Sequence, residues 1–171
     1  MGTSMASVAF RRTDDASWGN VKPQIEAMFQ GTEGLVSDLN QDKMSYAIVS
    51  PYGDMGMFLQ DLPAKISGLT GSYAVFAICV DSDFCFTELY FKGELVEKGC
   101  IGECYMEFDE FPGVQNPNSA LWMPLLLNPA DVQLLDAAFT GDEVFVEDQL
   151  RQISKLTDLP IFDDALVYGE F

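Results

Sequence analysis

The residues that could carry out chemistry are few in this sequence, and most of them lie near its middle. Asp81 and Asp83 flank Ser82, and a pair of carboxylates can bind a cation or act as acid and base. A thiolate can act as a nucleophile or a metal ligand, and the chain has four cysteines, Cys79, Cys85, Cys100 and Cys104. The chain has no histidine, so a Ser-His-Asp or Cys-His catalytic device is excluded.

Turn chemistry explains the Asp81-Ser82-Asp83 stretch without any catalytic role. Asp and Ser side chains hydrogen-bond to nearby backbone in tight turns, and this stretch separates two apolar, strand-like segments. It also lacks the glycine and the later glutamate of a calcium-binding EF-hand loop. We therefore expect a turn here. A small enzyme with carboxylate or thiol chemistry, using Asp81, Asp83, Cys85 or Cys104, stays open as an alternative.

The cysteines are expected to be reduced thiols in the protein core. Cys79 and Cys85 lie within apolar segments, where a free cysteine behaves as a small hydrophobic residue. Cys100 and Cys104 are four residues apart, which is wider than a Cys-x-x-Cys pair. A zinc site built from all four cysteines is the alternative. No glycine-containing stretch has the full pattern of a phosphate-binding loop, so we expect no cofactor.

Hydrophobic periodicity predicts helices and strands along the chain. Residues 20–30 carry one apolar stripe and predict a helix with Pro23 in its first turn. Residues 44–50 predict a strand, because they are rich in β-forming side chains, and residues 58–69 have helical spacing. Two further helices are expected, one between Asn128 and Gly141 and one over residues 146–156. The tail, residues 161–171, is predicted to add a final strand.

The strongest strand signal lies between residues 72 and 98. Residues 72–80 form an almost continuous apolar run, and residues 84–91 and 94–98 predict a second and a third strand. Together they predict an antiparallel meander at the centre of an α+β fold, flanked by about four helices. We expect a single α+β domain over residues 17–171, preceded by a flexible N-terminus over residues 1–16.

Negative charge dominates the composition. The chain of 171 residues has 27 acidic and 9 basic residues, a formal net charge of −18. Such a charge repels nucleic acids and anionic membranes and attracts basic proteins, although it also simply keeps a protein soluble. No apolar run approaches the roughly 20 residues that span a bilayer, and a secretory signal is lacking. We predict a cytoplasmic protein with a basic protein partner and no direct binding to nucleic acid or membranes.

One long segment concentrates this acidity. Between Gly99 and Leu150 there are ten acidic residues and no lysine or arginine. In part of it aromatic residues alternate with carboxylates, which suits docking on a basic protein surface, where aromatics anchor and charges steer. The predicted partner-binding residues are Glu103, Tyr105, Glu107, Phe108, Asp109, Glu110 and Phe111. The alternatives are a solvated acidic face over an aromatic core, or carboxylates that imitate the phosphates of DNA.

The middle and end of the chain resemble a pattern of poorly characterised bacterial α+β proteins. The stretch AVFAICVDSDFCFTELYFKGELVEKG contains an apolar strand ending in Asp-Ser-Asp and a Gly-Glu-Leu-Val hairpin, and the QNPNSALWMPLL and VFVEDQLRQISKLTDLP segments fit the same pattern. The resemblance covers residues 44–168. In size and charge the chain is similar to the small acidic immunity proteins of bacterial toxin systems. The motifs are structural, so they carry over no catalytic residue.

These observations favour a non-enzymatic, acidic protein-binding module, an inhibitor or immunity-type protein that covers a basic site on its partner. One alternative is the small enzyme described above, which should turn over a substrate. The other is a DNA-mimic inhibitor of a nucleic-acid-binding protein, which should compete with DNA for its target. The sequence does not fix the oligomeric state.

Overall fold

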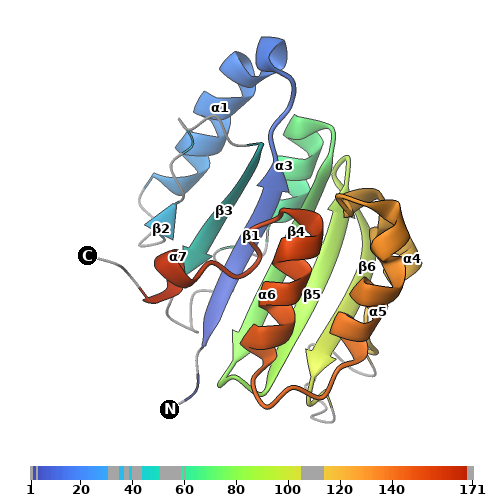
Figure 1. Cartoon of the computed structure of the whole chain (residues 1–171). Helices are drawn as coiled ribbons and strands as arrows, with labels where there is room; N and C mark the ends of the chain where they lie inside the picture. Colours follow the sequence, from blue (N-terminus) through green and yellow to red (C-terminus); the bar gives the residue numbers. More distant parts are fainter. Residues whose placement is uncertain are drawn as a thin grey trace.

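An antiparallel sheet of six strands forms the middle of the part of the chain that the structure describes (Figure 1). The structure is a computed structural model, and it describes residue 2 and residues 4–30, 35–36, 39, 44–50, 59, 61–104 and 114–168. The strands are β1 (Met5–Arg11), β2 (Leu35–Val36), β3 (Ser45–Ser50), β4 (Tyr73–Val80), β5 (Phe84–Phe91) and β6 (Glu94–Gly102). Their order across the sheet is β2-β3-β1-β4-β5-β6.

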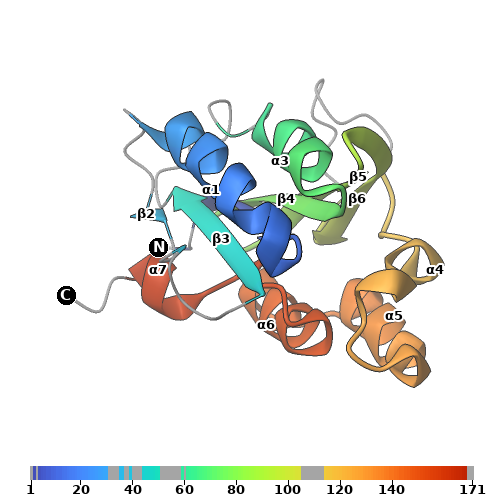
Figure 2. The ribbon, with the colours of Figure 1, turned by 90° about the horizontal axis from the view of Figure 1, so that it is seen from above.

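Helices cover both faces of this sheet (Figure 2). On one face lie α1 (Asp15–Phe29) and α3 (Leu62–Thr70). The other face carries α4 (Ser119–Trp122), α5 (Val132–Thr140), α6 (Val146–Thr157) and α7 (Asp164–Tyr168). Two short 3-10 turns, η2 (Met123–Leu125) and η3 (Pro129–Asp131), connect α4 to α5. The predicted α+β class, with helices flanking an antiparallel sheet, is confirmed.

The first strand lies at the centre of the sheet, where it pairs with both β3 and β4. Alternate residues of a strand point to opposite faces. Met5 and Ala9 accordingly belong to the core under α5 and α6, whereas Val8 and Phe10 belong to the core under α1 and α3. The prediction of a flexible N-terminus over residues 1–16 is therefore wrong from Met5 onward, because this segment completes the sheet and is buried on both sides.

Two polar side chains of β1 connect the sheet to the backbone of the helical layer. The Ser7 hydroxyl donates to the carbonyl of Ile161 at 2.8 Å. The Arg11 guanidinium donates to the carbonyls of Leu125 at 2.7 Å and of Thr157 at 2.5 Å. Burial lowers the pKa of Arg11, and the charge of Asp158 opposes that effect. The backbone carbonyls at the C-terminal ends of η2 and α6 thus accept hydrogen bonds from the Arg11 side chain of β1.

The helix predicted over residues 20–30 begins earlier, at Asp15. The Asp14 side chain accepts a hydrogen bond from the backbone N–H of Ser17 at 2.9 Å, which is a standard N-cap. Pro23 consequently lies inside the helix and not in its first turn. The tail is also different from the prediction of a strand. Asp163 accepts from the N–H of Ala165 at 3.0 Å and thereby caps a short helix, α7.

The predicted meander is confirmed as β4, β5 and β6, although it forms one half of the sheet and not its centre. Both of its turns have positive φ angles at two consecutive residues, the signature of a type I′ hairpin turn. In the first turn these are Asp81 (50°) and Ser82 (64°), and in the second they are Lys92 (51°) and Gly93 (89°). Glycine adopts such angles without strain, whereas Ser82 does not.

The outer edge of β6 is covered by the segment that follows it. The Cys100 N–H donates to the carbonyl of Gln115 at 2.9 Å, and the Asn116 side chain donates to the Cys100 carbonyl at 3.1 Å. The Glu97 carboxylate accepts from the indole N–H of Trp122 at 3.0 Å. A register shift between Leu89 and Tyr90 interrupts the pairing of β5 with β6. A register shift of this kind and a covering segment both hinder the edge strand of a sheet from pairing with another chain.

The contacts of Arg11 predict a large stability difference between two neighbouring arginines. Replacing Arg11 with methionine leaves two carbonyls without their donor, so we expect the free energy of unfolding to fall by about 2 kcal/mol or more. Arg12→Met removes an ion pair with Asp15, whose side chain is 87% exposed, and should lower it by less than about 1 kcal/mol. Urea unfolding measures both values. Equal losses in the two variants would contradict the role assigned to Arg11.

Candidate functional site

The partner-binding residues predicted from the sequence fall mostly on a segment that the structure leaves undescribed. Glu103 is exposed just beyond β6, and its N–H donates to the carbonyl of Asp83 at 2.8 Å. The other six residues lie outside the described residues: Tyr105, Glu107, Phe108, Asp109, Glu110 and Phe111. Their role in binding a partner stays a prediction.

The described part of the same acidic segment, residues 114–150, forms α4, α5 and the start of α6. It exposes large apolar side chains at between 40% and 82% of their surface: Leu121, Met123, Leu127, Leu134, Val144 and Phe145. Its carboxylates are Asp131, Asp136, Asp142, Glu143, Glu147 and Asp148, and it contains no lysine or arginine. We call the exposed part of residues 114–150 the acidic helical surface. Exposed apolar groups among charges of one sign are a feature of protein contact surfaces.

Charge is distributed unevenly between the two helical layers. Residues 114–168, which form α4 to α7, contain nine carboxylates and two basic residues. Residues 14–30 and 61–70, which form α1 and α3 with their caps, contain four carboxylates and two basic residues. The formal net charge is therefore −7 for residues 114–168, which carry the exposed apolar side chains, and −2 for the shorter segments that form α1 and α3.

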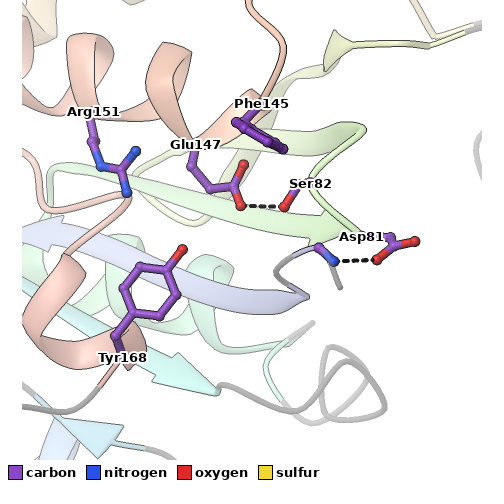
Figure 3. Close-up of a pocket in the computed structure, with 7 residues that line it drawn as sticks. Asp81, Ser82, Phe145, Glu147, Arg151 and Tyr168 are labelled. Carbon is purple, nitrogen blue, oxygen red and sulfur yellow. Dashed lines mark hydrogen bonds between the residues drawn. The ribbon is translucent and has the colours of Figure 1, made fainter.

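A pocket of about 590 Å³ lies at the end of this layer, next to the turn between β4 and β5 (Figure 3). Its lining comes from that turn, from the start of α6 and from the end of α7. The described residues that line it are Gly2, Asp81, Ser82, Phe145, Glu147, Arg151 and Tyr168. Phe145 belongs both to this pocket and to the acidic helical surface, so the two features are adjacent.

The centre of the pocket is a hydrogen bond between two buried side chains. The Ser82 hydroxyl donates to Oε1 of Glu147, and each residue is only 4% exposed. The Ser82 carbonyl also accepts from the N–H of Val146 at 3.0 Å, which joins the turn to the first residue of α6. Ser82 is held in the left-handed region, a conformation that persists only where surrounding contacts stabilise it.

The two buried glutamates among the described residues, Glu147 and Glu88, differ in the contacts that their carboxylate oxygens make. Glu88 is 3% exposed, and its carboxylate contacts the Lys98 ammonium at 3.2 Å and the Tyr90 hydroxyl at 2.6 Å. Burial and the bond to Glu88 raise the pKa of Tyr90. In contrast, Oε2 of Glu147 is buried without a hydrogen-bond partner. Buried carboxylates are normally fully hydrogen-bonded, and among the described residues only this oxygen and Oε1 of Gln149 are buried side-chain atoms without a hydrogen-bond partner.

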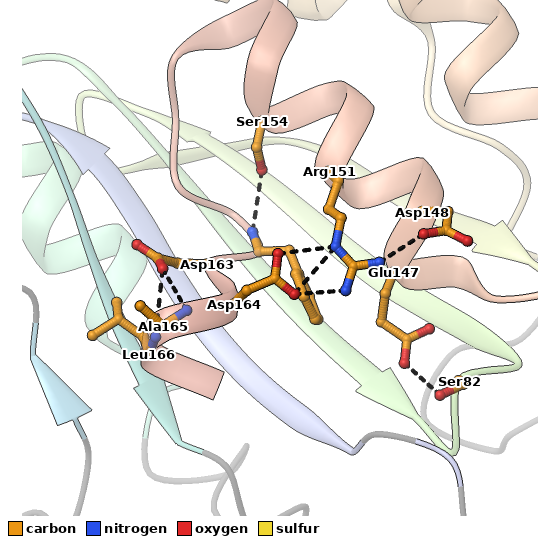
Figure 4. A network of polar contacts seen from close by, with 10 residues as sticks. Ser82, Glu147, Asp148, Arg151, Ser154, Asp163, Asp164, Ala165 and Leu166 are labelled. Atoms are coloured by element: carbon orange, nitrogen blue, oxygen red, sulfur yellow. Dashed lines mark hydrogen bonds and ion pairs between the residues drawn. The ribbon is translucent and has the colours of Figure 1, made fainter. Parts of the chain in front are cut away.

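Arg151 lies beside Glu147 but is bound to other carboxylates (Figure 4). Its guanidinium contacts Asp148 at 2.6 Å and Asp164 at 2.6 Å, and it lies 4.9 Å from the centre of the Phe162 ring. The hydrogen bond to Asp164 raises the pKa of Arg151, while the same bond lowers the pKa of Asp164. The stabilisation from a lowered carboxyl pKa is present above the ordinary value of 3.8 and is lost as pH falls through the lowered one.

The cysteines divide into two pairs. Cys79 and Cys85 are free and buried, as predicted, and they face each other across β4 and β5. Burial raises the pKa of the Cys79 thiol, which makes it a poor nucleophile. The prediction of reduced thiols is wrong for Cys100 and Cys104, which form a disulfide. Gly102, at a φ of 85°, turns the chain so that their Cα atoms lie 5.9 Å apart, within the range that a disulfide spans.

The enzyme alternative named four residues, and the structure does not bring them into one cleft. Asp81 lines the pocket, and Asp83 is exposed at the end of the same turn. Cys85 is buried in the core, and Cys104 is in the disulfide. Within the described ranges there is also no group of three or more cysteines and carboxylates arranged to hold a metal ion.

Sequence reasoning missed the pocket although it had singled out two of its parts. It interpreted the Asp81-Ser82-Asp83 stretch correctly as a turn, and it included Glu147 among the charges of the acidic segment. The residues come together only because α6 and α7 fold back on that turn. A glutamate beside the apolar stripe of the predicted helix over residues 146–156 was the one available signal.

The fold and the site define an acidic α+β protein with an apolar, carboxylate-rich helical surface and a carboxylate-lined pocket at its end. Compared with known proteins, the chain gives no match to a protein-family model, to a curated protein or to a solved structure. None of the helices in the described ranges has the length and apolar character needed to span a bilayer.

Ser82 offers a test of the contact at the centre of the pocket. Ser82→Ala removes the donor to Glu147 and should lower the free energy of unfolding by about 1–3 kcal/mol. Ser82→Gly loses the same bond but relieves the positive φ, so we expect it to be about 1 kcal/mol more stable than the alanine variant. Chemical denaturation provides the comparison. A glycine variant no more stable than the alanine variant would show that the turn is not strained.

Proposed function

We propose that this protein is a non-enzymatic binding module, an inhibitor or immunity-type protein that covers a basic site on a protein partner. The observation that carries the proposal is the acidic helical surface, where exposed apolar side chains lie among carboxylates with no basic residue in the segment. Because residues 114–150 hold six carboxylates and no basic residue, the surface complements a positively charged partner.

The two kinds of side chain on this surface have different roles in the proposed complex. Exposed carboxylates such as Asp142 and Glu143 attract the partner over a distance and raise the rate of association. Apolar side chains such as Leu134 and Phe145, which are 58% and 54% exposed, supply the buried contact area that holds it. The proposal therefore separates electrostatic control of association from apolar control of dissociation.

The proposed setting is the cytoplasm. The disulfide between Cys100 and Cys104 makes this part of the proposal directly testable, because cytoplasmic thiols are normally kept reduced. Recovery of the bridged form from cells, after trapping of free thiols, would contradict a cytoplasmic location.

Charge neutralisation on one layer tests the function. The surface variant carries Asp131→Asn, Asp142→Asn and Glu143→Gln, and the control variant carries Asp15→Asn, Glu26→Gln and Asp61→Asn on the opposite layer. Both lose the same charge. We expect the wild type and the control variant to capture one dominant basic protein from lysate at about 50 mM salt and to release it at about 500 mM salt.

The surface variant should associate with that captured protein about tenfold more slowly, while its dissociation rate changes little. Surface plasmon resonance with the purified partner measures both rates. Equal association rates for the two variants would contradict the assignment of this surface, and the absence of any salt-sensitive partner would contradict the function itself.

A further inference from the structure

The pocket beside α6 has the electrostatic character of a site for a cation. Among its described lining residues the charged groups are Asp81, Glu147 and Arg151. The positive charge of Arg151 is offset by Asp148 and Asp164, each at 2.6 Å. Asp81 and Glu147 would therefore attract a cation in the pocket and repel an anion, while the guanidinium that also lines it is already paired.

The hydrogen bonding of the Glu147 carboxylate favours a ligand that carries hydrogen-bond donors. It is 4% exposed, Oε1 accepts from Ser82, and Oε2 has no partner. The other buried glutamate, Glu88, shows how the same fold satisfies both oxygens, with Lys98 on one and Tyr90 on the other. Because Oε2 is closed off from solvent, a ligand donates to it only when the Glu147 side chain turns toward the pocket, and this contact would then complete at Glu147 the arrangement that Glu88 already has.

Aromatic rings stand at two sides of this carboxylate. In Figure 3 the Phe145 ring lies above the Glu147 carboxyl and the Tyr168 ring lies below it. Phe145 is 54% exposed and Tyr168 is 57% exposed, and the Tyr168 ring also contacts the Phe162 ring, with 6.2 Å between their centroids. A ring face attracts a cation, and it prefers a planar guanidinium that can stack on it.

Resting on the proposed function, we propose that this pocket receives an arginine side chain from the basic partner. A guanidinium matches three observations together, because it is a cation, carries five N–H donors and stacks on aromatic rings. A lysine ammonium supplies charge and donors but not the planar shape. The volume of about 590 Å³ lies within the range of ligand pockets and admits the side chain with its flanking backbone.

The first test uses N-acetyl-L-arginine amide as the probe, with N-acetyl-L-citrulline amide as its matched neutral control. In a titration followed by amide NMR, we expect the arginine probe to shift the signals of Ser82, Glu147 and Tyr168 with a dissociation constant in the millimolar range, as for a single side chain. Citrulline has the same shape without the charge and should bind at least tenfold more weakly. Equal binding of the two probes, or no shift with either, would overturn the proposal.

Variants locate the binding to these residues. Glu147→Gln keeps the size of the side chain and removes its charge, and we expect it to weaken the arginine probe at least tenfold. Tyr168→Leu, at an exposed position, should weaken it severalfold and keeps the test valid if Glu147→Gln fails to fold. Asp61→Asn, on the opposite layer, removes one charge and should leave the affinity within twofold. If Asp61→Asn and Glu147→Gln weaken binding of the arginine probe to a similar extent, the effect comes from net charge alone and the pocket assignment is wrong.

Binding of the arginine probe tests the pocket assignment, and association with the partner tests the proposed function independently. If the arginine probe fails while the charge-neutralised surface variant still associates slowly with its partner, the pocket assignment is wrong and the proposed function stands. If the probe binds selectively but no salt-sensitive partner is found, the pocket takes a cationic ligand and the proposed function is wrong.

Discussion

The structure depends on the insertion of β1 between β3 and β4. Every residue from Met5 to Phe10 is buried, and alternate residues contribute to the cores on the two faces of the sheet. On the face covered by α5 and α6, where a purely apolar strand would pack as well, β1 carries Ser7 and Arg11. Their hydrogen bonds end on carbonyls from the segments around η2 and α6. The second helical layer, and with it the acidic helical surface and the pocket, is thus fixed to the earliest strand of the chain.

Much of the fold could be predicted from the sequence, because local pattern and final environment agree there. Three segments favour by themselves the conformation that they adopt in the folded chain: the apolar run of β4, the turn residues around Gly93, and the N-cap residue Asn128. The prediction failed for β1, because its sequence MASVAFR contains only one β-branched and one aromatic side chain and therefore has a weak β-forming signal. It failed for α7, because β-forming residues such as Val167 were given more weight than the cap formed by Asp163.

The candidate site was harder to predict than the fold, because its residues come from three separate segments. Ser82 and Glu147 are 65 positions apart, and neither has a neighbour in sequence that indicates the other. Net charge suggested that a carboxylate in the acidic segment would face solvent, yet Glu147 is buried at the start of α6. A helix start favours a negative charge, since its first N–H groups are unpaired and the helix dipole is positive there. This placement explains how a carboxylate is tolerated with only one hydroxyl donor.

The cover over β6 also limits how a partner can bind. Many proteins recognise a peptide by adding it as a further strand to an open sheet edge. Here Gln115 and Asn116 already occupy the hydrogen-bonding groups of Cys100, and the Glu97 side chain is used by Asn118 and Trp122. Along this stretch of the edge, backbone-directed recognition would have to displace the protein's own chain. At this stretch of β6 recognition is then left to side chains, so partner choice there can change through surface substitutions that leave the sheet untouched.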